Sequence, residues 1–146
     1  MRLRELLEGT EITALTISPD TEITHVCADS RRARKGSLFA AVPGTLCDGA
    51  LYAQQAVDRG AACVLCRQEM PGLPCAAVPD VRAALGKIAC TWYENPAARL
   101  TVLGVTGTNG KTTTTYLLRH ILRSAGIKTG LIGTVQNLVE EQMLPA

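Results

Sequence analysis

The chain has 146 residues and a mass of 15.5 kDa, with 47% hydrophobic and 19% charged residues, a balance that favours a globular fold and excludes disorder. No apolar run reaches the roughly 18 residues of a membrane-spanning helix, and acidic residues interrupt the N-terminal stretch where a secretion signal would lie. The net charge of +2 and the five scattered aromatic residues do not favour nucleic acid as a partner. We therefore expect a cytoplasmic protein without membrane insertion.

The first part of the chain alternates short apolar runs with amphipathic helical patterns. Residues 38–42 and 61–66 are predicted strands, residues 75–78 are a short apolar segment, and residues 52–59 form a predicted helix that ends at Gly60. Asp80 is the expected N-cap of a second helix, whose apolar residues recur on one face until Asn95-Pro96. This alternation predicts parallel β-α-β units in an α/β fold.

The second part begins after Pro96 and has a different charge. Residues 1–98 carry 10 basic and 11 acidic side chains, whereas residues 99–146 carry 5 basic and 2 acidic ones, so the second part suits an anionic ligand. Its pattern predicts a strand at 100–105, a helix at 111–124 with an apolar stripe, and a strand at 128–133. Residues 135–144 are compatible with a strand or a hairpin. We predict domains at 1–98 and 99–146.

The six cysteines do not form a recognisable metal or disulfide framework. Cys63 and Cys66 form a C-x-x-C pair, but they lie in a predicted strand, where positions three apart point to opposite faces. No second pair and no neighbouring histidine pair completes a zinc site. We expect the cysteines to be small buried apolar side chains.

A glycine-rich loop carries the strongest functional signal. The stretch GVTGTNGKTTT at residues 104–114 lies between a predicted strand and a predicted helix, which is the context of a phosphate-binding loop. Backbone N–H groups of such a loop face phosphate oxygens, Lys111 would supply a positive charge, and the Thr112 hydroxyl could ligate Mg²⁺. Val105 departs from the common pattern, which has glycine there. The predicted nucleotide-binding residues are Gly107, Thr108, Asn109, Gly110, Lys111, Thr112 and Thr113.

This loop resembles the ATP-binding loop of the Mur ligases, cytoplasmic enzymes that add amino acids to the peptidoglycan precursor. Thr108 and Thr115 favour the member that adds the third amino acid over the member that adds D-alanyl-D-alanine, which usually has serine and lysine at these positions. The first half also resembles the family's UDP-binding domain, through DSR at 29–31, KGSLFAAVPG at 35–44 and DG at 48–49. Ser37 and Ala50 depart from the aspartate and histidine usual there.

The resemblance implies a ligase with two substrate sites on this chain. ATP and Mg²⁺ would bind the 107–113 loop, with Lys111 as a catalytic residue, and UDP-MurNAc would bind Ala28, Ser30, Arg31, Thr45, Leu46 and Cys47. ATP would phosphorylate a carboxylate of UDP-MurNAc-L-Ala-D-Glu, and the amine of a diamino acid would then displace phosphate. We expect domain 1–98 to bind UDP-MurNAc and residues 99–146 to begin an ATP-binding domain, so that the chain alone is an inactive fragment.

Other readings stay open at this point. The chain could belong to another Mur-family ligase, such as the D-Ala-D-Ala-adding member, to a small P-loop kinase or GTPase, or to a non-catalytic nucleotide-binding module. A kinase would need an acidic magnesium residue after the loop, where only Glu140 and Glu141 occur. The sequence does not distinguish L-lysine from meso-diaminopimelate as the added amino acid, and it does not define an oligomeric state.

Overall fold

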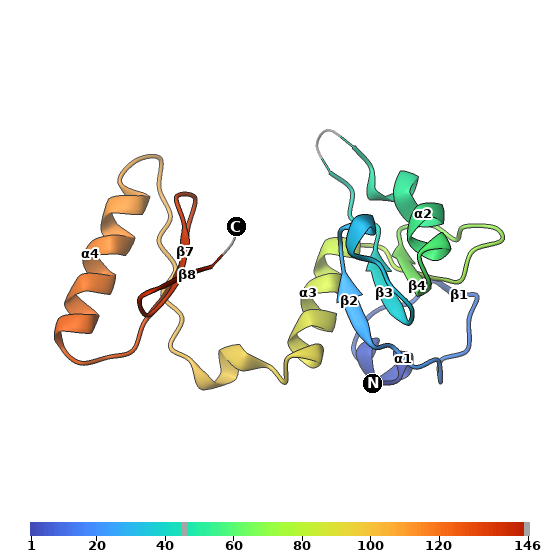
Figure 1. The fold of residues 1–146 in the computed structure, drawn as a ribbon, viewed down its shortest axis with the longest axis horizontal. Coiled ribbons are helices and arrows are strands. Elements are labelled where there is room, and N and C mark those ends of the chain that lie inside the picture. Colours follow the sequence, from blue (N-terminus) through green and yellow to red (C-terminus); the bar gives the residue numbers. More distant parts are fainter. Residues whose placement is uncertain (45–46, 145–146) are drawn as a thin grey trace. The chain divides into compact units, whose positions relative to one another are not determined.

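A computed structural model describes residues 1–44 and 47–144 of the chain (Figure 1). The chain divides into two compact units, Met1–Leu100 and Thr101–Ala146. Each unit has its own sheet, and each is described separately below. Within the described ranges, no helix is long and apolar enough to cross a membrane.

The first unit is built on a five-stranded sheet with the order β1-β5-β4-β3-β2. Strands β2 to β5 are parallel, and the two-residue strand β1 pairs antiparallel with β5. This arrangement confirms the predicted α/β class with a parallel sheet. The predicted strands at 38–42 and 61–66 form, and the short apolar segment at 75–78 contains a further strand. The strands are β1 (Ala14–Leu15), β2 (His25–Cys27), β3 (Ser37–Ala40), β4 (Ala61–Cys66) and β5 (Cys75–Ala77).

Helices cover both faces of this sheet (Figure 1). Helices α1 (Leu3–Leu6) and α3 (Val81–Trp92) pack against one face through Leu6, Ile88 and neighbouring apolar residues, while α2 (Ala53–Asp58) covers the other face. Short 3-10 helices lie at Ser30–Arg32, Gly49–Tyr52 and Pro96–Arg99. Two apolar cores, one on each face, therefore hold the sheet in place.

Helix α3 begins as its sequence predicts. The Asp80 carboxylate accepts hydrogen bonds from the backbone N–H groups of Arg82 at 2.9 Å and Ala83 at 3.1 Å, which satisfies two of the free donors of the first turn. The helix ends at Trp92, before Asn95, which has a left-handed φ of 51°. Since α3 begins at Val81, shortly after β5 ends at Ala77, its first turn lies at the carboxyl edge of the parallel sheet.

The cysteines follow the prediction in part. Cys63 belongs to the core on the α3 face and Cys66 to the core on the α2 face, as the spacing of the pair predicts. Burial raises the pKa of both thiols to about 12, so they stay protonated at neutral pH. Cys47 and Cys90, however, are exposed. The prediction was wrong for these two, because Cys47 lies in a loop and Cys90 on the solvent side of α3.

The second unit contains helix α4 (Lys111–Ser124) and a three-stranded antiparallel sheet. Arg123 forms an ion pair with Glu141, and the Arg119 guanidinium donates to the backbone carbonyl of Glu140. Both arginines therefore hold the turn of the hairpin at 137–144. The strands are β6 (Gly130–Ile132), β7 (Asn137–Val139) and β8 (Gln142–Leu144).

Residues 100–105 do not form the predicted strand. The apolar run is present, but a strand needs a hydrogen-bonded neighbour, and the sheets of residues 1–44 and 47–144 provide none for it. Leu100 and Val102 are accordingly 67% and 72% exposed. The apolar stripe of α4 is exposed as well, with Leu117 at 58% and Ile121 at 62%.

Candidate functional site

The loops that follow the parallel strands meet at one edge of the first unit. Residues 28–34 follow β2, residues 41–44 and 47–48 follow β3, and residues 67–74 follow β4. Because β2, β3 and β4 are parallel neighbours, these three loops start side by side at the carboxyl edge of the sheet. Ligands of open α/β sheets bind at this edge.

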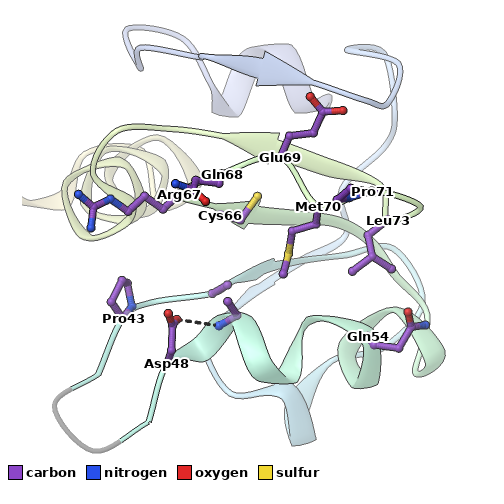
Figure 2. Close-up of a pocket in the computed structure, with 12 residues that line it drawn as sticks. Pro43, Asp48, Gln54, Cys66, Arg67, Gln68, Glu69, Met70, Pro71 and Leu73 are labelled. Atoms are coloured by element: carbon purple, nitrogen blue, oxygen red, sulfur yellow. Dashed lines mark hydrogen bonds between the residues drawn. The ribbon is translucent and has the colours of Figure 1, made fainter.

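A groove of about 660 Å³ lies between two of these loops (Figure 2). Asp48 and Gln54 line it on the side of α2, whereas Met70 and Leu73 come from the loop after β4. Its walls combine apolar side chains with a few polar groups, the usual make-up of a small-molecule site. The other lining residues are Ala41, Pro43, Ala50, Cys66, Arg67, Gln68, Glu69 and Pro71.

The predicted substrate residues at 28–31 lie in the loop after β2. Ala28 is exposed, and the buried Ser30 hydroxyl donates to Gln55 Oε1 of α2 at 2.7 Å. Ser30 therefore has a structural partner already, although its oxygen can accept a second hydrogen bond. None of these residues lines the groove, which begins one loop further along the sheet.

Arg31 is held by the carboxylate next to it in sequence. The Arg31 Nη2 atom lies 2.8 Å from Asp29 Oδ2, and the Arg31 backbone N–H donates to Asp29 Oδ1 at 2.9 Å. These bonds lower the pKa of Asp29 to about 2. The Arg31 side chain is still 80% exposed, so the pair orients a guanidinium group that stays accessible to an anion.

The Asp29 pair makes a testable contribution to stability at low pH. Because the folded-state pKa of Asp29 lies below its usual value of 3.8, ionised Asp29 stabilises the fold above that pH, and the effect is lost as pH falls towards 2. We expect Asp29→Asn to lower the free energy of unfolding at pH 7 and to become equal to wild type near pH 2. Urea denaturation from pH 7 to pH 2 measures this; a constant difference across that range would contradict it.

The segment after β3 is closed by contacts between its two ends. Pro43 and Asp48 form an isolated antiparallel bridge, and the Gly44 N–H donates to the Cys47 carbonyl at 3.0 Å. Cys47 is exposed. A side-chain hydrogen bond with Cys47 raises the pKa of Tyr52. The predicted substrate residues Thr45 and Leu46 lie outside the described residues.

The predicted phosphate loop lies in the second unit and leads into α4. Gly107 has a φ of 146° and Gly110 a φ of 77°, a conformation that favours glycine. Across residues 1–44 and 47–144, no protein acceptor is hydrogen-bonded to the N–H groups of residues 108–113. These donors, together with the helix N-terminus, suit an anion.

Lys111 and Thr112 begin helix α4. The Lys111 ammonium donates to the carbonyl of Gly107 at 2.6 Å and to that of Thr108 at 3.3 Å, so the charge lies over the loop that precedes its own helix. Thr112 is exposed, and its backbone carbonyl accepts from the Thr115 hydroxyl at 2.8 Å. The Thr112 hydroxyl can offer one oxygen to a magnesium ion, whose other ligands would be phosphate and water.

Sequence reasoning missed the groove wall made by the loop after β4. The stretch from Arg67 to Leu73 carries no motif, and its proline and glycine residues are typical of any connecting loop. Asp48 was noted only as part of a family pattern, although its carboxylate accepts from the Ala50 N–H at 2.9 Å and lines the groove. The available signal was the topology of the sheet. All parallel strands end at the same edge, so the loops that follow them lie together there.

Two family models match the chain. The Mur ligase family, catalytic domain, matches residues 22–93, and the Mur ligase middle domain matches residues 105–145. The matched segments contain the loops at the carboxyl edge of the first unit and the 107–113 loop of the second. The chain belongs to the Mur ligase family.

Comparisons with individual proteins show which Mur ligases the chain resembles. The chain is 43% identical to UDP-N-acetylmuramoyl-L-alanyl-D-glutamate–2,6-diaminopimelate ligase of Caldanaerobacter subterraneus subsp. tengcongensis over 99% of its length, but it spans only 30% of that relative. A solved structure of a ligase of the same name superposes with a TM-score of 0.76 and 26% identity, covering 99% of this chain and 30% of the other. The structure of MurF ligase from Thermotoga maritima in complex with ADP superposes with a TM-score of 0.54 and 28% identity, covering 71% of this chain and 24% of the other.

Proposed function

We propose that this chain carries the UDP-MurNAc-binding domain and the start of the ATP-binding domain of a ligase that adds a diamino acid to UDP-MurNAc-L-Ala-D-Glu. The single observation that carries the proposal is that two Mur ligase family models match successive segments of the chain, residues 22–93 and residues 105–145. The reaction would belong to cytoplasmic synthesis of the peptidoglycan precursor.

The uridine diphosphate end of the substrate would bind at the carboxyl edge of the first unit. The exposed guanidinium of Arg31, oriented by Asp29, would meet a phosphate, and the ends of the segment after β3 would meet the uridine. The Ser30 oxygen would accept a hydrogen bond from the substrate while its hydroxyl continues to donate to Gln55 Oε1. Ala28, Thr45, Leu46 and Cys47 remain proposed contacts of the same substrate.

ATP would bind at the start of α4. Lys111 would leave the Gly107 carbonyl to neutralise the β- and γ-phosphates, and the free N–H groups of residues 108–113 would hold phosphate oxygens. Magnesium bound at Thr112 would reduce phosphate charge. The γ-phosphoryl group would pass to a substrate carboxylate oxygen, with ADP as the leaving group. The amine nitrogen would then attack the acyl carbon and lose a proton, and phosphate would leave with the C–O electrons.

The superpositions favour this reading over the D-Ala-D-Ala-adding member. A structure named UDP-N-acetylmuramoyl-L-alanyl-D-glutamate–2,6-diaminopimelate ligase aligns over 99% of the chain with a TM-score of 0.76 and 26% identity, against 84%, 0.62 and 30% for the D-alanyl-D-alanyl ligase from Acinetobacter baumannii. The names of the relatives support 2,6-diaminopimelate as the diamino acid.

Calorimetric titration of the 146-residue polypeptide with UDP-MurNAc-L-Ala-D-Glu, UMP and ATP tests the proposal. We expect binding of the UDP-sugar and of ATP. Incubation with both of them and with 2,6-diaminopimelate, followed by chromatography, should give no amide product, because the chain spans about 30% of its relatives. UMP should bind more weakly, since it lacks the second phosphate and the sugar. Absence of any uridine nucleotide binding would instead favour the kinase class, and amide formation by this polypeptide would contradict the expectation of an inactive fragment.

A further inference from the structure

One long-range contact joins helix α3 to the segment after β3. The Arg82 guanidinium donates through Nη2 to the backbone carbonyl of Pro43 at 2.6 Å, across 39 positions of sequence. This contact is possible because α3 begins after β5 at the same edge of the sheet where the segment after β3 begins. A guanidinium bond to a carbonyl is charge-assisted and stronger than a neutral one.

The carbonyl that Arg82 holds is at the base of the proposed substrate loop. Pro43 bridges to Asp48, the Gly44 N–H donates to Cys47, and the Gly49 N–H donates to the Val42 carbonyl at 3.1 Å. Pro43 and Asp48 also line the groove. Among residues 1–44 and 47–144, Arg82 provides the one side-chain hydrogen bond that reaches residues 42–44 from another element.

We propose that Arg82 is a positioning residue for the uridine nucleotide site. It fixes the Pro43 end of the loop base, so that Cys47 and Asp48 face the ligand in one orientation before binding. The loop base is then already ordered in the free protein, so that binding does not lose free energy by ordering it. The ordering of the loop base by Arg82 follows from the contacts alone, whereas its contribution to nucleotide binding rests on the proposed function.

A matched control lies on the same helix. The Lys87 ammonium donates to the backbone carbonyl of Gly9 at 2.7 Å, which is also a cation-to-carbonyl contact from α3 to a distant segment. Gly9, however, does not line the groove. Arg82→Ala and Lys87→Ala therefore remove equivalent bonds, and only the first of them touches the loop base.

Amide hydrogen exchange on the free 146-residue chain tests the structural step. We expect Arg82→Ala to raise the exchange rates of the Gly44 and Gly49 amides at least fivefold, because both are hydrogen-bonded within the loop base. Lys87→Ala should leave both rates within twofold of wild type. Unchanged rates in Arg82→Ala, or an equal increase in Lys87→Ala, would overturn the proposal.

Titration with UDP-MurNAc-L-Ala-D-Glu tests the consequence for binding. Arg82→Ala should raise the dissociation constant about tenfold. Arg82→Lys should recover most of the affinity, and Lys87→Ala should bind with wild-type affinity. ATP affinity should be equal in all four proteins. Wild-type affinity in Arg82→Ala would overturn the inference while leaving the proposed function intact. Failure of the wild-type chain to bind would overturn the proposed function and, with it, the role of Arg82 at a nucleotide site.

Discussion

Lys111→Ala is expected to weaken ATP binding roughly tenfold to a hundredfold. The ammonium group lies over the loop at 2.6 Å from the Gly107 carbonyl, at the position where it can turn to the β- and γ-phosphates. A hydrogen bond to a charged group is worth about 1.5 to 3 kcal/mol, and alanine removes it completely. Titration with ATP in the presence of Mg²⁺ measures the change.

Lys128→Ala is the matched control for Lys111→Ala. Lys128 lies in the same unit, its side chain is 91% exposed, and its Nζ atom is 3.8 Å from Glu140 Oε1. Removing this charge should leave ATP affinity within twofold of wild type, because an exposed charge away from the loop is screened by salt. Equal losses of affinity in the two variants would mean that net charge, and not the contact of Lys111, governs binding. Unchanged affinity in Lys111→Ala would contradict its assignment.

Gly49→Ala is expected to destabilise the first unit by about 1 to 3 kcal/mol and to weaken binding of the UDP-sugar. A Cβ atom at Gly49 would lie 2.7 Å from both the nitrogen and the oxygen of Val42. These are backbone atoms at the base of the loop after β3, so they cannot move aside without shifting the Pro43–Asp48 bridge. Urea denaturation and titration with UDP-MurNAc-L-Ala-D-Glu measure the two effects.

Gly86→Ala provides the comparison for Gly49→Ala. Apart from the chain neighbours of Gly86 and the backbone of its own helix α3, no atom lies within 4 Å of the position that a Cβ would take there. Alanine there should therefore stabilise the protein by about 0.5 to 1 kcal/mol and leave nucleotide binding unchanged. A stability of Gly49→Ala equal to that of wild type would show that the loop base can expand, contrary to the close contacts around Gly49.

Local signals made part of this fold predictable. The Asp80 cap and the apolar periodicity that follows it correctly predicted α3, because capping and one-sided burial act within a few residues. The two-residue strand β1 escaped prediction, since Ala14-Leu15 is too short to show alternation. Residues 100–105 show the converse: an apolar run predicted a strand, but strand formation depends on a neighbour that sequence does not reveal.

The proposed site was predictable to the extent that it lies in one segment. Gly107 to Thr113 are consecutive, so the motif itself placed them in one loop. The groove of the first unit, by contrast, combines Asp48, Gln54 and Leu73, which only the register of the parallel strands brings together. Arg82 had no signal at all, because its role depends on where α3 begins relative to the loop after β3.

The short strand β1 also covers one edge of the sheet in the first unit. Its two residues pair with Ala76 and Ala77 along the outer edge of β5, and flanking bonds from the Thr13 and Thr16 N–H groups to Ala77 and Cys75 extend this cover. An uncovered strand edge is a template for pairing with another chain. The segment from Thr13 to Thr16 thus covers this edge of β5, and its removal would leave the backbone groups of β5 open to intermolecular β-pairing.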